Sequence, residues 1–128
     1  MQSEVTHLLD AASLLVEPEF HRVCALDDLW EGEMLEVEVM GQRVLLVHGD
    51  GGHVSAVQPL CPHQRVPLVE GELIRNVLTC RAHLWQVDVR TGCGLNPRHA
   101  HVALYPVKVE GGDVFVSVRG IVPRYSAP

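Results

Sequence analysis

The chain has 128 residues, of which 47% are hydrophobic and 20% are charged, and its formal net charge at pH 7 is −6. This composition is typical of one globular domain, and the acidic balance argues against a nucleic-acid-binding protein and against a protein that binds anionic membranes. No apolar run approaches the ~18 residues of a membrane span, and Glu4 stands where a secretory signal would be basic, so we expect a cytoplasmic protein.

Residues 1–20 form an N-terminal extension with a helical pattern. Apolar side chains recur there at spacings of three and four residues, and the pattern ends before Pro18. A short amphipathic helix is therefore predicted, which could pack on the domain, meet a partner or fray as termini commonly do. The domain itself is predicted to span residues 21–128.

After the extension the apolar period changes to two. Residues 35–39 alternate apolar and acidic side chains, which predicts a strand with one wet face. Residues 44–47 form a more buried run, and Gly41-Gln42 supplies a tight turn, so the two segments should form a hairpin. A turn at residues 50–52 leads into a further strand at 54–57.

Two short Cys/His pairs dominate the middle of the chain. Cys61-Pro-His63 and Cys80-Arg-Ala-His83 are separated by sixteen residues, and together they offer two thiolates and two imidazoles. Such a set suits Zn(II) or an iron–sulfur centre in which two His replace two Cys on one iron. Structural zinc sites usually pair Cys with Cys and His with His. Because each knuckle here gives one of each, we favour the two-iron cluster, with zinc as the alternative.

The C-terminal part returns to short strands. Residues 107–110 alternate, a glycine turn follows at 111–113, and apolar residues recur at 114, 116 and 118. Strands separated by glycine turns on both sides of the knuckles predict an all-β domain with the knuckles in loops of an inserted subdomain. The remaining cysteines, Cys24 and Cys93, are interpreted as a small buried residue and a loop thiol.

The knuckles, the run Cys80-Arg-Ala-His-Leu-Trp85 and the later Gly92-Cys-Gly-Leu-Asn-Pro97 resemble a Rieske ferredoxin. More narrowly, they resemble the ferredoxin component of soluble diiron toluene, alkene or isoprene monooxygenases. The similarity extends from about residue 23 to residue 123. It implies the Rieske fold, a small antiparallel β-sandwich with an inserted cluster-binding subdomain whose loops span about residues 59–99. It also implies one [2Fe–2S] cluster, with the ligands Cys61, His63, Cys80 and His83.

Three neighbouring residues indicate which kind of Rieske centre the resemblance implies. Val66 and Ala82 occupy positions where high-potential members carry a disulfide, and Trp85 replaces a hydroxyl donor. Without a hydroxyl hydrogen bond to sulfide, the reduced cluster is less stable and the potential falls. We therefore expect a reduction potential of about −150 to 0 mV, which suits a soluble carrier better than a quinol-oxidising complex.

The implied function is that of a one-electron carrier. It would link an NADH-dependent flavin reductase to the diiron hydroxylase of an aromatic or alkene monooxygenase, and would have no substrate site of its own. The alternatives are the ferredoxin of a ring-hydroxylating dioxygenase and the small Rieske subunit of a nitrite-reductase-type enzyme.

Both partners of such a carrier should meet one face around the exposed histidine edges. A monomer is expected, and the net charge of −6 predicts basic patches on the partners. Besides the two His, this docking face is predicted to contain Gln64, Leu84, Trp85, Asn96 and Pro97.

Overall fold

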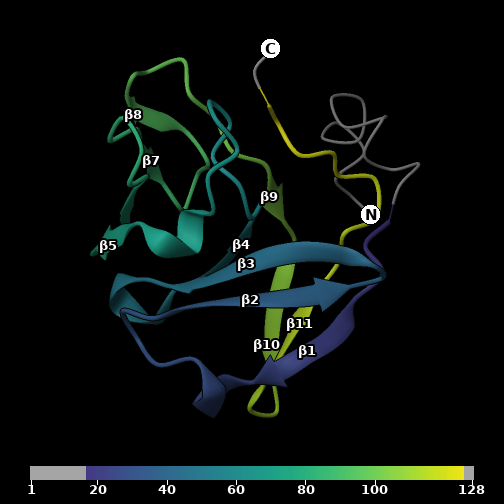
Figure 1. Cartoon of the computed structure of the whole chain (residues 1–128). Helices are drawn as coiled ribbons and strands as arrows, with labels where there is room; N and C mark the ends of the chain where they lie inside the picture. The colour runs from purple at the N-terminus through teal and green to yellow at the C-terminus, as the bar shows by residue number, and fades with distance from the viewer. Residues whose placement is uncertain (1–16, 126–128) are drawn as a thin grey trace, which may run out of the picture.

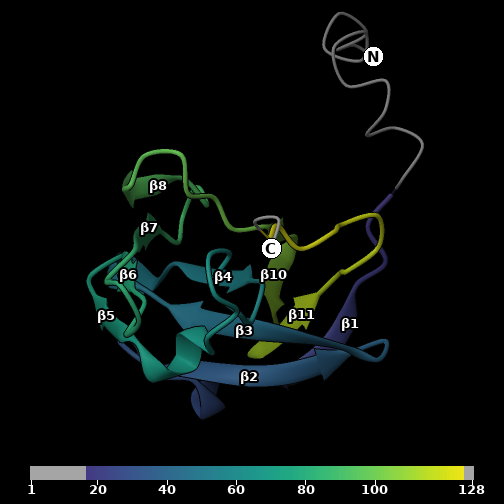
Figure 2. The same cartoon turned by 45° about the horizontal axis from the view of Figure 1, so that its top comes forward.

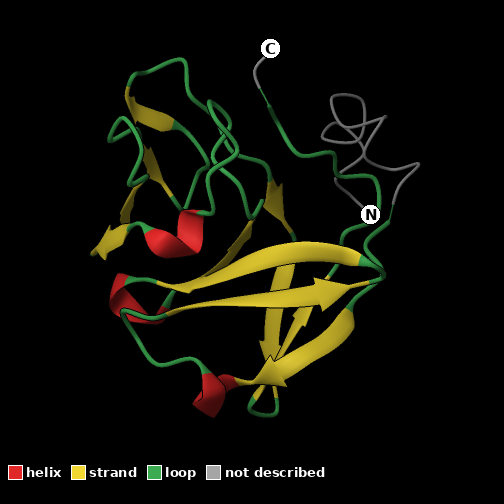
Figure 3. Cartoon of the chain, in the orientation of Figure 1, coloured by secondary structure: helices red, strands yellow, loops and turns green. Residues whose placement is uncertain are grey.

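The computed structural model describes residues 17–125. The helix predicted for residues 1–20 therefore falls almost entirely outside the described residues. The helical segments among residues 17–125 are single 3-10 turns (Figure 3), and none of them is long and apolar enough to cross a bilayer. In chain order the elements are β1 (His21–Ala25), η1 (Leu26–Asp28), β2 (Met34–Val39), β3 (Gln42–His48), η2 (Asp50–Gly52), β4 (Val54–Val57), η3 (Leu68–Glu70), β5 (Glu72–Ile74), β6 (Val77–Thr79), β7 (Gln86–Asp88), β8 (Gly94–Asn96), β9 (Leu104–Tyr105), β10 (Val107–Glu110) and β11 (Asp113–Val116).

The strands form three antiparallel sheets, which confirms the all-β prediction. One sheet has the order β1-β11-β10, a second has β2-β3-β4-β9, and the third has β5-β6-β7-β8. The third sheet is inserted in sequence between β4 and β9 and lies on the opposite side of β2 and β3 from β1, β10 and β11 (Figure 1). We call the first two sheets the body, and residues 59–101 the inserted subdomain.

The β2–β3 hairpin forms as predicted, but its turn lies one residue earlier. Val39 pairs with Gln42, so Met40 and Gly41 are the turn residues, with φ angles of 51° and 79°. Two-residue hairpin turns need positive φ at both positions because that geometry matches the twist of the strands. Gln42 instead continues the ladder as the first residue of β3.

The β3 strand lies between two hydrophobic cores. Val44 and Leu46 face the core between the two body sheets, whereas Leu45 and Val47 face the core beneath the inserted subdomain. All four side chains are fully buried. Successive strand residues point to opposite faces, so a strand covered on both faces is apolar at every position, which explains the continuous run in the sequence.

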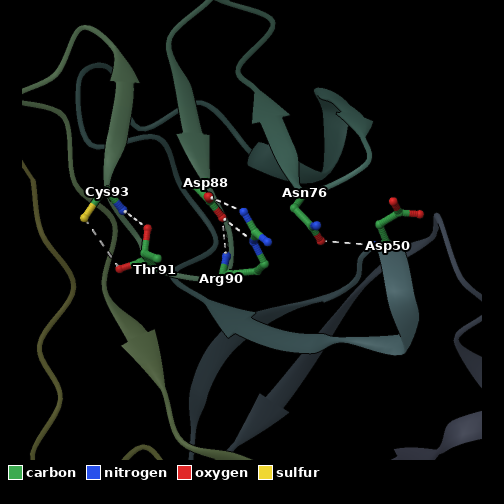
Figure 4. Close-up of polar contacts among 6 residues, drawn as sticks. All are labelled: Asp50, Asn76, Asp88, Arg90, Thr91 and Cys93. Carbon is green, nitrogen blue, oxygen red and sulfur yellow. Dashed lines mark hydrogen bonds and ion pairs between the residues drawn. The ribbon is translucent and has the colours of Figure 1, made fainter.

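A polar contact joins the body to the inserted subdomain at the turn between β5 and β6. The Asn76 side-chain oxygen accepts a hydrogen bond of 3.0 Å from the backbone N–H of Asp50 in η2 (Figure 4). The Asn76 carbonyl accepts a second bond, of 2.9 Å, from the Val89 N–H. A Cβ atom at Gly49 would overlap the Asn76 amide. Glycine at this position therefore lets the two regions approach closely.

Candidate functional site

The two knuckles are closed in the same way. The Cys61 N–H donates to the Val66 carbonyl at 2.8 Å, and the Cys80 N–H donates to the Trp85 carbonyl at 2.7 Å. Each Cys therefore begins a six-residue loop, and the fifth residue of each loop has a φ of 56°. Only a left-handed residue at this point lets so short a loop return to its own start.

The thiols of Cys61 and Cys80 meet at the base of the loops. Both residues are buried in the core beneath the inserted subdomain, and Cys61 is close enough to Cys80 to influence its pKa. Burial raises the pKa of the Cys80 thiol; the Ala82 backbone N–H opposes this change and Cys61 adds to it. The thiol therefore keeps its proton at neutral pH, and a metal must displace that proton to bind.

The imidazoles lie on the outer side of the same loops. His63 and His83 are exposed, and their ring centroids are 5.0 Å apart at an interplanar angle of 68°. No group of three or more His, Cys, Asp or Glu among residues 17–125 is placed to hold a single ion. The donors instead form one sulfur pair and one imidazole pair, which is the division that a mixed two-iron cluster uses.

Trp85 contributes to both the core and the outer surface. Its ring stacks on the His63 ring at 4.5 Å with an interplanar angle of 8°, and the His99 ring meets it edge-on at 5.5 Å. The side chain is half-buried and packs against the core beneath the inserted subdomain. The sequence predicted Trp85 for the docking face, and the structure shows that its side chain also packs against a core.

The remaining residues predicted for the docking face are at least partly accessible to solvent. Gln64, Leu84 and Asn96 are exposed and Pro97 is half-buried. Leu84 keeps 63% of its surface exposed, and Leu95, which the sequence did not single out, keeps 47%. Leu84 directly follows His83, so an exposed apolar side chain adjoins this imidazole.

The loop after β8 folds back over the turn between β7 and β8. The Val102 N–H donates to the Gly92 carbonyl at 3.0 Å, and the Ala100 N–H donates to the Pro97 carbonyl at 3.1 Å. A Cβ atom at Gly94 would overlap the carbonyls of Pro97 and Ala100. The glycine of the Gly-Leu-Asn-Pro run therefore allows the backbone of this loop to lie directly against β8.

An ion pair fixes the turn of the β7–β8 hairpin. The Asp88 carboxylate accepts hydrogen bonds from the Arg90 backbone at 2.8 Å and from its guanidinium at 3.0 Å (Figure 4). The Arg90 side chain is the main cause that lowers the Asp88 pKa below its ordinary value. Nearby, the Cys93 N–H donates to the Thr91 hydroxyl. Cys93 is an exposed loop thiol and Cys24 is buried, as predicted.

Gln58 and the C-terminal segment that it holds were not predicted from the sequence. Gln58 is fully buried; its amide nitrogen donates to the carbonyls of Leu60 and Arg124, and its oxygen accepts from the N–H groups of Ala103 and Arg124, all within 2.9 Å. The last described residues therefore pass beside the chain that joins β8 to β9 (Figure 2). The sequence shows only a polar residue between the apolar residues Val57 and Pro59, which does not identify its partners.

Comparisons with known proteins agree on one family. The family model of the Rieske [2Fe-2S] domain matches residues 19–106. The ferredoxin component of the alkene monooxygenase system of Xanthobacter autotrophicus is 48% identical over 99 residues, which cover 77% of this chain and 80% of that protein. The ferredoxin component of biphenyl 2,3-dioxygenase of Rhodococcus jostii is 37% identical over 100 residues, which cover 77% and 92% of the two chains.

A solved structure matches over the same region. The ferredoxin of carbazole 1,9a-dioxygenase from Nocardioides aromaticivorans superposes with a TM-score of 0.70 and 33% identity. The match covers 77% of this chain and 96% of that one. The body and the inserted subdomain therefore correspond to a complete ferredoxin of that kind.

Proposed function

This chain belongs to the Rieske [2Fe–2S] domain family, and from that membership we propose that it is the ferredoxin of a multicomponent alkene or aromatic monooxygenase. Its cofactor is a Rieske-type [2Fe–2S] cluster, and it is an electron-transfer component, as its relatives are named. In the proposed role it receives electrons from an NADH-dependent flavin reductase and delivers them to a diiron hydroxylase. We further propose that the domain of residues 21–128 acts as a cytoplasmic monomer.

The observation that carries this proposal is the division of the four donors. Cys61 and Cys80 are buried together, and His63 and His83 are exposed together. In the proposed site the two thiolates hold the inner iron and the two imidazoles hold the outer one. The bound cluster supplies storage of one electron at a time. The chain supplies the buried sulfur side and an open imidazole edge through which a partner is reached.

The surroundings of the knuckles support a low reduction potential. Val66 and Ala82 are half-buried and pack against the core beneath the inserted subdomain. Trp85 presents a ring face to His63. None of these three side chains offers a hydroxyl or a second cysteine beside the site. Without such donors the reduced form gains little stabilisation, so the proposed potential stays in the low part of the Rieske range.

A dioxygenase ferredoxin is the second candidate. Dioxygenase ferredoxins match over the same share of this chain at lower identity, for example 35% for the p-cumate 2,3-dioxygenase ferredoxin of Pseudomonas putida. Both candidates carry one electron and differ only in the terminal acceptor. The higher identity to the alkene monooxygenase ferredoxin favours a diiron hydroxylase as that acceptor.

Single-turnover oxidation of the reduced protein by a diiron hydroxylase tests the proposal, with and without excess redox-inactive reductase. The reductase should compete, because both partners need the imidazole edges. Trp85→Ala should slow electron transfer by about tenfold, the loss expected for one interface anchor worth ~1.4 kcal/mol. The spectrum of the cluster should remain nearly unchanged because Trp85 is not a ligand.

Trp30→Ala is the matched control. Trp30 is 70% exposed, but it follows η1 in the body and should lie outside the docking face. Its loss should leave the transfer rate unchanged. Normal transfer by Trp85→Ala together with no competition by the reductase would refute the shared docking face. Stoichiometric zinc in colourless protein would refute the electron-carrier role altogether.

A further inference from the structure

The net charge of −6 is distributed unevenly along the chain. Residues 17–58, which form β1 to β4, hold nine acidic and two basic residues. Residues 59–101, the inserted subdomain, hold three acidic residues and five arginines. Charge–charge interactions in salt solution decay over about 8–10 Å, so a partner at the imidazole edges experiences mainly the local charges.

Ion pairing increases the local excess of positive charge. Arg81 contacts Glu70 at 2.6 Å, and Arg90 contacts Asp88 at 3.0 Å. These pairs use two of the three acidic residues of the inserted subdomain and leave Glu72. Three of its arginines make no ion pair with a described residue, and Arg124 in the C-terminal segment makes none either. The unpaired arginines of this part are Arg65, Arg75, Arg98 and Arg124.

One of these arginines, Arg124, lines a groove beside the first knuckle, and a second, Arg65, contacts a residue of its lining. The groove has a volume of about 360 Å³, and Pro62, Trp85, His99 and Arg124 are among its lining residues, none of which is acidic. The Tyr125 ring also lines it, and the Arg65 guanidinium lies over that ring at 4.5 Å.

Hydrogen bonds fix the position of one residue that lines this groove. Gln58 binds both backbone groups of Arg124 at 2.8 Å, so this segment has a fixed position. Arg98 directly precedes His99, another residue of the lining. Arg124 therefore belongs to a preformed concave surface that adjoins the ring stacked on His63, Arg65 contacts that surface through Tyr125, and Arg98 is the sequence neighbour of a lining residue.

We propose that this groove receives carboxylate side chains of the oxygenase that accepts the electron. The inference rests on the proposed function and specifies the chemistry of the partner: an acidic segment, not the basic patch that the net charge of −6 suggests. Guanidinium groups bind carboxylates through charge-assisted hydrogen bonds. A carboxylate held here places the acceptor against Trp85 and the His63 edge, while the acidic body repels the wrong orientation.

A partner-free test uses two small oxidants of opposite charge. The anionic, carboxylate-bearing complex [Co(EDTA)]⁻ takes one electron from the reduced protein and becomes the Co(II) complex with charge −2; hexaamminecobalt(III) is the cationic comparison. Stopped-flow oxidation should show that the rate with [Co(EDTA)]⁻ falls as salt rises, because the local attraction is screened. A rate that rises with salt would mean that the acidic body governs the approach, and would overturn the proposal.

Substitution of Arg124, which lines the groove, and of Arg98, which precedes a lining residue in sequence, sharpens this test. Arg98→Gln and Arg124→Gln should each slow oxidation by [Co(EDTA)]⁻ about twofold to threefold at low salt, since each removes one nearby charge. Arg75→Gln is the matched control, because Arg75 is exposed and unpaired but lies at the β5–β6 turn. Equal effects of all three substitutions would mean that overall charge sets the oxidation rate, and would contradict a specific role for the groove.

The same variants then meet the diiron hydroxylase. Arg98→Gln and Arg124→Gln should slow its reduction and flatten the salt dependence, whereas Arg75→Gln should not. If the cobalt rates change as expected but hydroxylase rates do not, the groove is basic but is not the docking site. If the wild-type protein reduces no hydroxylase while the cobalt results hold, the proposed function fails and the basic groove remains.

Discussion

The two cores on either side of β3 differ in what holds them together. In the body, β2 and β3 pair over six residues, and β1 and β10 pair with β11 around a core of valines and leucines. In the inserted subdomain each strand has only three residues, and the core includes the thiols of Cys61 and Cys80. The body resembles an independent small β-domain, whereas the inserted subdomain has too little paired backbone to be stable alone.

Backbone strain follows the same division. Five non-glycine residues among the described part of the chain have positive φ, and only Met40 lies in the body. A left-handed conformation costs about 1–2 kcal/mol per residue. The other four, all in the inserted subdomain, are Arg65, Arg75, His83 and Leu84. Ligation of a cluster at the two knuckles would offset this cost, so the subdomain should depend on its cofactor and the body should not.

Removal of a thiolate should have the largest effect. Cys61→Ser or Cys80→Ser should abolish the cluster, because a serine hydroxyl is a poor substitute for thiolate. Iron and acid-labile sulfide should fall from two each per chain to none. Amide hydrogen exchange should become fast across β5–β8 and remain slow in β3 and β11.

Cys93→Ser is the matched control for this experiment. Cys93 is a free, exposed thiol in the same subdomain, and its replacement should leave two irons and two sulfides. Equal loss of exchange protection in the body and the subdomain after Cys80→Ser would contradict the division proposed between them.

A pair of neighbouring leucines provides the second, intermediate test. Leu45 and Leu46 are both fully buried on β3 but face opposite cores. Truncation of either residue to Ala should lower the free energy of unfolding by about 2–5 kcal/mol. Only Leu45→Ala should also speed cluster loss in the presence of a chelator, because its cavity opens toward the two thiols.

Absorbance in the visible region measures that loss, and urea unfolding measures the stability change. The two variants serve as controls for each other, because they remove the same atoms from the same strand. If Leu46→Ala releases iron as fast as Leu45→Ala, then global unfolding, rather than the local core, controls cluster lifetime.

Much of the fold was predictable because it depends on local patterns. Alternation in β2, the glycine turn before β11 and the Cys/His spacing are each encoded within a few residues. The burial of Leu45 and Leu46 on opposite faces of β3 was harder to predict, because a continuous apolar run does not say what covers each face.

The composition of the site was harder to predict beyond its ligands. Gln58 gains its role from Ala103 and Arg124, which lie far from it in sequence, and no local pattern records such contacts. Net charge is equally silent about the distribution of charge. A sum over the whole chain does not show that acidic residues cluster in one region while unpaired arginines cluster in the other.

A titration in the body gives the smallest expected effect. Tyr105 in β9 is only 4% exposed, and its hydroxyl makes no hydrogen bond with another described residue. Burial, and secondarily the nearby Tyr125, raise the Tyr105 pKa above its ordinary value of 10.0. Tyr105→Phe should change the free energy of unfolding at pH 8 by no more than about 1 kcal/mol, because it removes a hydroxyl without a partner.

The difference in free energy of unfolding between the wild type and Tyr105→Phe should grow at alkaline pH. Below pH 10 Tyr105 is neutral in both the folded and unfolded states, so its contribution is fully present. As pH rises through the raised folded pKa, the unfolded chain gains more from ionisation and stability is lost. Tyr105→Phe should escape this loss, so its urea midpoint should exceed that of the wild type at pH 11.

Tyr125→Phe should give a smaller gain, because Arg65 opposes the rise of the Tyr125 pKa. Equal gains from both substitutions would show that Tyr105 in the body core is no more strongly desolvated than Tyr125.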